Sequence, residues 1–202
     1  YTISFNSNTS GLVSAIGAAG IEPGDEVIVT PYTMSATATA ILAYQGIPIF
    51  ADIDEKSFCL DPIEVEKKIS SRTKAIMTTG IFGHPSQMDD LIKIAKKNNL
   101  VVIEDAAQAP GAIYKNIKIG SKADMTVFSL NVHKHIHTGE GGMVTTNNDD
   151  FAERLRLIRN HGEAVLENKK QEDISNCFGF NLRLTEIQAV MAIEQLKKLP
   201  SL

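Results

Sequence analysis

The sequence predicts an α/β fold in which a mostly parallel sheet is flanked by helices. Short segments rich in β-branched residues alternate with segments whose apolar residues recur at helical spacing, without internal repeats or low-complexity tracts. Several strand-like segments are apolar throughout, which is typical of parallel strands buried on both faces. The 202 residues, 43% of them hydrophobic, are enough to bury the core that such a fold needs.

The first half of the chain alternates regularly between the two kinds of segment. Apolar residues at spacings of three and four mark the helices, and clusters of Gly, Pro, Asn and Asp separate them from the β-branched runs. Pro48 is tolerable near the start of its strand, where a missing ladder donor does little harm. In chain order we expect a helix at about 9–19, a strand at 26–30, a helix at 36–44, a strand at 47–53, a helix at 62–69, a strand at 75–79, a helix at 88–98 and a strand at 100–103.

The second half departs from this alternation. Two short strands with no helix between them enclose a turn that contains Lys134, and two helices follow. Thr185 and Gln188 have the spacing of a capping box at the start of the second helix. A polar, charged stretch between the helices is expected to be a surface loop. These elements are strands at 126–130 and 142–146, helices at 149–160 and 185–196, and the loop at 163–176.

Composition and charge argue against several classes of partner. A net charge of −4, with charges of both signs mixed along the chain, leaves no basic face for nucleic acid. No apolar run approaches a membrane span and the first residues do not resemble a signal peptide, so a cytoplasmic protein is expected. Cys59 and Cys177 stand far apart and outside any metal-ligand spacing, which fits a reducing compartment without a disulfide framework.

Lys134 is the residue that points most directly to chemistry. It follows the apolar strand that ends at Leu130 and precedes a glycine-rich turn, whose backbone can approach a ligand closely. Lysines that lose solvent in such places form imines with aldehydes. The alternative is that Lys134 is one solvated surface lysine among many, as most lysines are.

Asp105 follows the run Val101-Val102-Ile103-Glu104, at the carboxyl edge of the expected sheet, where α/β proteins usually place their sites. An aspartate there can keep a pyridine nitrogen protonated, so that together with Lys134 it suggests the cofactor pyridoxal 5′-phosphate (PLP). Gln108, three residues on, can hydrogen-bond the phenolic oxygen of the pyridoxal ring. Equally open is that Asp105 is the N-cap of a helix beginning at Ala106, with Gln108 completing a capping box.

A candidate phosphate site lies at the start of the first helix. The backbone amides of Asn8 and Thr9 open that helix, and free amides at a helix N-terminus bind phosphate readily. The hydroxyl of Ser129 is placed to join the same anion. The alternatives are ordinary helix capping by Thr9 or Ser10, and for Ser129 a polar residue at a strand end.

Other cofactors are less well supported. His133, His135 and His137 alternate, which on an extended segment would place three imidazoles on one side, but no carboxylate is spaced to complete a metal site. These histidines are expected to line the site or to bond to backbone. The sequence has neither G-x-G-x-x-G after a strand nor a Walker A pattern, so NAD and ATP are not favoured.

The order of these motifs resembles the DegT/DnrJ/EryC1/StrS aminotransferases, PLP enzymes of the type I fold that mostly aminate nucleotide-linked keto-sugars. The resemblance extends over nearly the whole chain. Any one of the motifs can arise by chance, but hardly all of them in this order. They are Ser7-Asn8-Thr9, the run from Gly20 to Ile28, Glu104-Asp105-Ala106-Ala107-Gln108-Ala109, Thr138-Gly139-Glu140-Gly141-Gly142 and Gly179-Phe180-Asn181-Leu182-Arg183.

The resemblance implies roles for three residues around the cofactor ring. Lys134 would hold the PLP aldehyde as a Schiff base and later move a proton between substrate and cofactor carbons. Asp105 would pair with the pyridinium nitrogen. Gln108 would contact the ring hydroxyl.

The same resemblance extends to the phosphate and to a second subunit. The backbone amides of Asn8 and Thr9, with the hydroxyl of Ser129, would hold the phosphate. In the family an asparagine of the late glycine-containing motif reaches the cofactor phosphate of the neighbouring subunit, and Asn181 matches it. A homodimer with shared active sites is therefore implied.

One position departs from the family pattern. Where most members stack an aromatic residue on the pyridine ring, this sequence has Met34, whose thioether can pack against a ring face with an attraction of about 0.3–1.5 kcal/mol. Tyr32 next door is the alternative. Residues 1–202 are expected to form the PLP-binding large domain, without the family's preceding residues and C-terminal small domain, so that part of the substrate pocket is absent.

The predicted function is that of a PLP-dependent aminotransferase, with L-glutamate as amino donor and a nucleotide-linked keto-sugar as acceptor, acting in two stages through pyridoxamine phosphate. Family members that replace the lysine by histidine dehydrate sugars instead, and Lys134 is intact here. A relative that makes an aromatic amino acid by dehydration keeps its lysine, so a PLP-dependent dehydratase stays open. A non-catalytic regulator that retains the fold is the third hypothesis, disfavoured by intact Lys134, Asp105 and Gln108.

Overall fold

A seven-stranded sheet forms the centre of the computed structural model, which describes residues 1–163 and 178–202. Five neighbouring strands run parallel, and β9 runs antiparallel to both of its neighbours, β8 and β1. The mostly parallel sheet that the sequence predicts is confirmed. In sheet order the strands are β1 (Thr2–Phe5), β9 (Gly142–Thr145), β8 (Met125–Ser129), β5 (Val101–Asp105), β4 (Thr73–Thr79), β2 (Glu26–Val29) and β3 (Ile47–Phe50).

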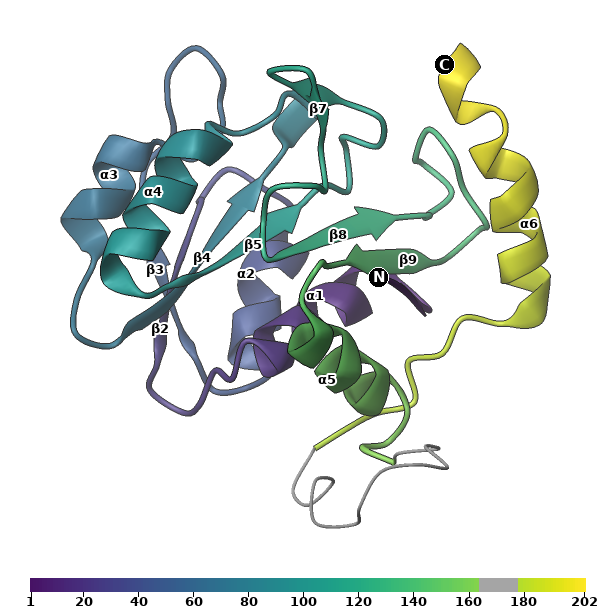
Figure 1. The fold of residues 1–202 in the computed structure, drawn as a ribbon, viewed down its shortest axis with the longest axis horizontal. Helices are drawn as coiled ribbons and strands as arrows, with labels where there is room; N and C mark the ends of the chain where they lie inside the picture. Colours follow the sequence, from purple (N-terminus) through teal and green to yellow (C-terminus); the bar gives the residue numbers. More distant parts are fainter. Residues whose placement is uncertain (164–177) are drawn as a thin grey trace.

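Helices cover both faces of this sheet (Figure 1). Helices α1, α2 and α5 lie on one face, and α3 and α4 lie on the other. Helix α6, yellow in the picture, packs through Ala192 against Leu130 and Ile136 of the connection between β8 and β9. The helices are α1 (Asn8–Ala18), α2 (Ser35–Leu42), α3 (Pro62–Lys68), α4 (Met88–Asn98), α5 (Asp149–Arg159) and α6 (Glu186–Leu196), and the remaining elements are the hairpin of β6 (Ile113–Tyr114) and β7 (Ile117–Lys118) and the 3-10 turns Ile81–Gly83 and Leu199–Ser201.

The elements with strong local signals form where the sequence predicts them. Helix α4 occupies the expected residues 88–98. The capping box of α6 is present, because the Thr185 hydroxyl accepts from the Gln188 amide at 3.3 Å and the Gln188 side chain accepts from the Thr185 amide at 3.1 Å. Within the described ranges, the helices are too short or too polar to cross a membrane.

Other elements differ from expectation. Strand β3 stops at Phe50 instead of continuing to residue 53. Strand β1 and the hairpin of β6 and β7 were not expected, because β1 depends on pairing with the distant β9 and each hairpin strand has only 2 residues. The loop expected at 163–176 lies, apart from Glu163, outside the described residues.

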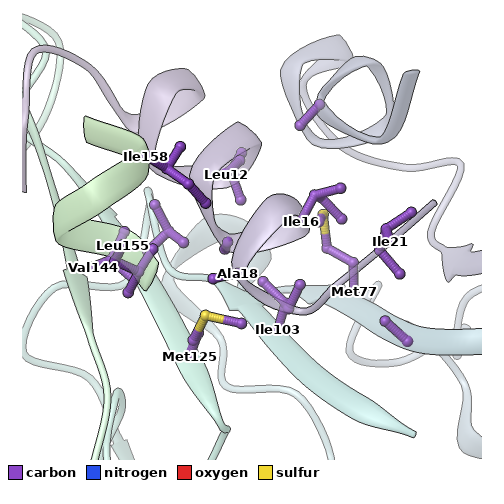
Figure 2. Packing of buried hydrophobic residues seen from close by; sticks show 14 of the residues in the cluster. Leu12, Ile16, Ala18, Ile21, Met77, Ile103, Met125, Val144, Leu155 and Ile158 are labelled. Carbon is purple, nitrogen blue, oxygen red and sulfur yellow. The ribbon is translucent and has the colours of Figure 1, made fainter. Parts of the chain in front are cut away.

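The hydrophobic core has two parts, one on each face of the sheet. Side chains alternate along a strand, so Met77 and Ile103 pack on the side of α1, whereas Ile76 and Val102 pack on the side of α4. Figure 2 shows the first part, in which the labelled side chains are Leu12, Ile16, Ala18, Ile21, Met77, Ile103, Met125, Val144, Leu155 and Ile158. The same alternation places Asp105 on the face of α1.

Helix α1 is capped by Ser7, so the alternative of capping by Thr9 or Ser10 is wrong. The Ser7 hydroxyl accepts a hydrogen bond from the Ser10 amide at 3.1 Å, while the Ser10 hydroxyl donates to Asn6 Oδ1 at 2.6 Å. Ser7 has the extended backbone that an N-cap requires, with φ −161 and ψ 164. The amides of Asn8 and Thr9 therefore lie in the first turn.

Replacing Ser7 by Ala should lower the free energy of unfolding by about 1 kcal/mol, because a first-turn amide loses its acceptor. Thr9→Ala is the matched control with little expected change, since the exposed Thr9 side chain does not cap the helix. Urea denaturation of both variants measures the difference. Equal losses in the two variants would contradict Ser7 as the cap.

Candidate active site

The carboxyl edge of the parallel strands gathers most of the candidate residues. Asp105 ends β5, Ser129 ends β8, and Thr79, the register partner of Asp105, ends β4. Helices α1 and α2 follow β1 and β2, so their N-termini lie at the same edge. The connection from β8 to β9 carries Lys134 there. This edge is the candidate active site.

Asp105 is buried and accepts hydrogen bonds from both helices. Its Oδ2 accepts from Thr37 Oγ1 at 2.7 Å, and its Oδ1 accepts from Asn8 Nδ2 at 3.3 Å and from the Ala107 amide at 3.1 Å. Burial raises the pKa of the Asp105 carboxyl above its ordinary value, whereas the accepted hydrogen bonds, led by that of Thr37, and the charge of Lys134 lower it. The described partners of the carboxyl are donors, as an ionised acid requires.

Asp105 does not cap a helix, so the capping interpretation is wrong. Residues 106–112 form turns, and the Ala107 amide closes a local turn on the carboxylate. Gln108 instead accepts a hydrogen bond at Oε1 from the Phe82 amide at 2.7 Å. Phe82 has a φ of 53, which is uncommon for a residue with a side chain. Gln108 thus anchors the turn after β4, and its NH₂ group is the part that suits a phenolic oxygen.

Lys134 lies half-buried in a tight turn between β8 and β9. The turn is closed by hydrogen bonds from the Lys134 amide to Asn131 O at 2.9 Å and from the Val132 amide to Gly139 O at 2.8 Å. The positive charge of Lys134 contributes to lowering the pKa of Asp105. The amine of Lys134 therefore lies near enough to Asp105 for their charges to interact.

The histidines beside Lys134 do not form the row that an extended segment would give. The segment is a succession of turns and bends, in which His133 and His135 are exposed while Ile136 is buried. His137 is partly buried, and its Nδ1 has no hydrogen-bond partner in the described structure. In the part of the chain that the structure describes, no group of three or more His, Cys, Asp or Glu side chains is placed to hold a metal ion.

The first turn of α1 is a candidate cradle for an anion. The amides of Asn8 and Thr9 have no carbonyl four residues back within the helix to bond to. Gly142, the register partner of Ser129, packs directly against this turn. A Cβ at Gly142 would stand 2.4 Å from Ser7 O and 2.7 Å from Asn8 N, so only glycine permits the approach.

Ser129 completes a set of groups that fits PLP. Its buried hydroxyl accepts from the Asn131 amide at 3.2 Å, which leaves its hydrogen for an anion. With the amides of α1 it offers donors to a phosphate, Asp105 offers an acceptor to a protonated ring nitrogen, and Lys134 offers an amine to an aldehyde.

Met34 occupies the N-terminal end of α2, with 70% of its surface exposed. One turn later Thr37 reaches Asp105, so Met34 belongs to the helix end that borders the site. The Tyr32 ring lies instead with Phe58 and Phe82, its centroid 6.0 Å from each. The assignment of Met34 to the ring-stacking position stays a prediction.

Asn181 lines a hollow that does not include Lys134 or Asp105. The hollow has a volume of about 850 Å³ and is also lined by Ser7 and by Arg183. Asn181 is exposed and forms an isolated bridge with Asn160. Its expected contact with a neighbouring subunit stays a prediction.

Two buried residues near the site, Thr37 and Glu104, were not among the sequence candidates. The only sequence signal that could have indicated Thr37 is a threonine within an apolar helix, four residues after Thr33. Glu104 lies on the opposite face of the sheet from Asp105, where its Oε2 accepts from Thr126 Oγ1 at 3.1 Å and from the Gly120 amide at 3.3 Å. Its Oε1 has no partner in the described structure, and burial raises the pKa of Glu104 to about 7.

The model of the DegT/DnrJ/EryC1/StrS aminotransferase family matches residues 1–202. The chain belongs to this family. It is similar to GDP-perosamine synthase from Caulobacter vibrioides, with 42% identity over 198 residues, which are 98% of this chain and 52% of that protein. The chain spans about half the length of the curated relatives that it matches.

Solved structures of aminotransferases share the fold of this DegT/DnrJ/EryC1/StrS chain. The aminotransferase from Psychrobacter cryohalolentis has a TM-score of 0.92 and 35% identity, over 100% of this chain and 53% of that one. NtdA from Bacillus subtilis, solved with the bound cofactor PMP, has a TM-score of 0.88 and 35% identity, over 98% of this chain and 44% of that one. The predicted fold class, that of the PLP-dependent aminotransferases, is confirmed.

Gly142→Ala should weaken the binding of both inorganic phosphate and PLP about tenfold or more, because the methyl group displaces amides that would bond a charged group. Gly46→Ala is the matched control, since its Cβ would also be crowded, at 2.9 Å from Ile41 Cγ2, but outside the anion cradle. Equilibrium titration of the full-length protein measures both affinities. Loss of affinity in Gly46→Ala alone would contradict the cradle.

Glu104→Gln should remove a pH dependence of stability. The pKa of Glu104 is raised from 4.5 to about 7, so the folded protein keeps a proton that the unfolded chain releases, and stability falls as the pH rises through this window. At pH values above this window, the loss in the free energy of unfolding reaches about 3 kcal/mol. Urea denaturation at about pH 5 and pH 8 measures the slope. The exposed control Glu55→Gln should keep the wild-type slope, and an unchanged slope in Glu104→Gln would disprove the assignment.

Proposed function

We propose that the full-length protein is a PLP-dependent aminotransferase. The observation that carries the proposal is the meeting of Lys134 and Asp105 at one sheet edge, beside the first-turn amides of α1. When bound, PLP supplies an electrophilic aldehyde and a ring that takes up electrons from a substrate carbon. Membership of the family and the PMP bound to NtdA support the assignment.

Each residue of the site has a task that its chemistry suits. Asp105 would face the ring nitrogen and hold a proton there, since a buried carboxylate favours a nearby positive charge. The amine of Lys134 would bind the aldehyde and, once released, carry a proton at Nζ. The amides of Asn8 and Thr9 would bind the phosphate where the dipole of α1 favours an anion.

Further side chains would orient the cofactor. The hydroxyl of Ser129 would donate to the phosphate, and the NH₂ group of Gln108 would donate to the ring hydroxyl. Met34 would cover a face of the ring through its thioether, which is more flexible than an aromatic side chain.

The proposed amino donor is L-glutamate and the proposed acceptor is a nucleotide-linked keto-sugar. The similarity to GDP-perosamine synthase supports a sugar linked to a nucleotide. The protein is proposed to act in the cytoplasm on these small molecules, without nucleic acid or membrane partners.

A homodimer with shared active sites is part of the proposal. Helix α6 exposes apolar side chains, with Ile187 76%, Val190 61% and Ile193 58% accessible in the single chain. Contiguous exposed apolar side chains of this kind favour an interface. Asn181, a few residues before α6, would then reach the cofactor phosphate of the neighbouring subunit.

Borohydride reduction of the full-length protein with PLP should leave a covalent adduct that Lys134→Ala abolishes, because Nζ of Lys134 is the amine that binds the aldehyde. Lys118→Ala, which removes an exposed lysine, is the control and should keep the adduct. Mass spectrometry of the intact variants measures it. An undiminished adduct in Lys134→Ala would reject the assignment.

L-Glutamate added alone to the PLP-loaded protein should release about one equivalent of 2-oxoglutarate per site, because a transaminase completes its first stage without the acceptor. Chromatography of the released acid measures the yield. A PLP-dependent dehydratase would leave the glutamate intact, and that outcome would replace the aminotransferase by the dehydratase hypothesis.

A further inference from the structure

A chain of hydroxyl groups leads from the end of β4 to Asp105. Thr79 Oγ1 donates to Thr33 Oγ1 at 3.2 Å, and the hydroxyls of Thr33 and Thr37 lie 2.8 Å apart. Thr37 Oγ1 then donates to Asp105 Oδ2 at 2.7 Å. Thr37 is fully buried and Asp105 is 3% exposed, so water does not compete for the hydrogen bond between them, whereas Thr33 is partly exposed.

The donor and acceptor in each hydrogen bond of this series follow from the number of hydrogens that each group carries. A hydroxyl has a single hydrogen to donate, and an ionised carboxylate only accepts. Thr37 gives its hydrogen to Asp105, so it must accept from Thr33, which in turn accepts from Thr79. Each hydroxyl therefore points toward Asp105 and polarises the next one.

Such donors matter because the surroundings of Asp105 otherwise favour the neutral acid. Burial raises the pKa of its carboxyl, and the hydrogen bond from Thr37 is the largest of the effects that lower it. Among the described charged groups, Lys134 from the connection after β8 acts in the same direction as Thr37. Glu104 neighbours Asp105 on β5, but the alternation of the strand turns its carboxyl to the other face.

We propose that Thr37, supported by Thr33 and Thr79, is a positioning residue that keeps Asp105 ionised and oriented toward the ring nitrogen of the cofactor. This inference rests on the proposed function, because the orientation has a use only where a protonated ring nitrogen faces Asp105. Thr33 and Thr37 also flank Met34 in the sequence. The same hydroxyl chain therefore fixes the helix end that presents the thioether.

Substitutions of the threonines separate the hydroxyl from the bulk of the side chain. Thr37→Val removes the hydroxyl at nearly constant volume, Thr37→Ser keeps it, and Thr33→Val removes the second donor alone. Thr39→Val is the matched control, because Thr39 lies on the same helix but is exposed.

The ionisation of Asp105 is measured in the full-length apoprotein by ¹³C NMR of labelled aspartate carboxyls, with Asp105→Asn to identify the signal. The titration midpoint should rise by about one pH unit in Thr37→Val and by less in Thr33→Val, because a hydrogen bond to a charged group is lost or weakened. The midpoint of Thr37→Ser should return toward the wild-type value, and the midpoint of Thr39→Val should equal the wild-type value. The dissociation constant of PLP should rise about tenfold in Thr37→Val.

A midpoint and a PLP affinity that stay unchanged in Thr37→Val would overturn the proposal. Should Thr37→Val fail to fold, the comparison of Thr33→Val with Thr39→Val decides, since only the former should raise the midpoint. If the midpoint rises in Thr37→Val but the wild-type protein binds no PLP, the proposed function is rejected. The role of Thr37 in orienting Asp105 toward the cofactor ring is then rejected as well.

Discussion

A buried carboxylate surrounded by donors organises the carboxyl edge of the sheet. Asp105 accepts one hydrogen bond from the first turn of α1, through Asn8, and one from the first turn of α2, through Thr37. Both helices must therefore begin at this edge and direct their N-termini toward it, which a helix following a parallel strand does. The positive ends of the helix dipoles favour the same negative charge. The turn that carries Lys134 then supplies the opposite charge across the site.

The position of α1 depends on close packing against the sheet. A Cβ at Gly11 would stand 2.7 Å from Val127 Cγ1, and a Cβ at Gly142 would meet the backbone of Ser7. Leu12 and Ile16 of the same helix belong to the buried core, in which Figure 2 labels both. The core and the anion cradle are thus parts of one packing arrangement. A shift of α1 relative to the sheet would therefore move the amides of the site.

Strand alternation places two adjacent buried acids on opposite faces of the sheet, and burial raises the pKa of both. Asp105 faces α1 and α2, where hydrogen-bond donors and the charge of Lys134 oppose this effect of burial. Glu104 faces the other side of the sheet, where Thr126 and Gly120 bond to one oxygen only. One residue of register therefore separates an acid whose two oxygens both accept hydrogen bonds from an acid with one oxygen that has no partner in the described structure.

Local signals were enough to predict the alternating elements, helix α4, the capping box of Thr185, and the motifs that contain Asn8, Asp105 and Lys134. Strand β1 was not predicted because it depends on pairing with β9, which is distant in the sequence. The alternative of capping by Thr9 or Ser10 was wrong because neighbouring hydroxyls cannot be told apart in the sequence, whereas the backbone conformation makes Ser7 the N-cap. The contact between Thr37 and Asp105 could be found only in the folded chain, because a hydrogen bond depends on distances of a few tenths of an ångström between groups that no spacing along the chain relates.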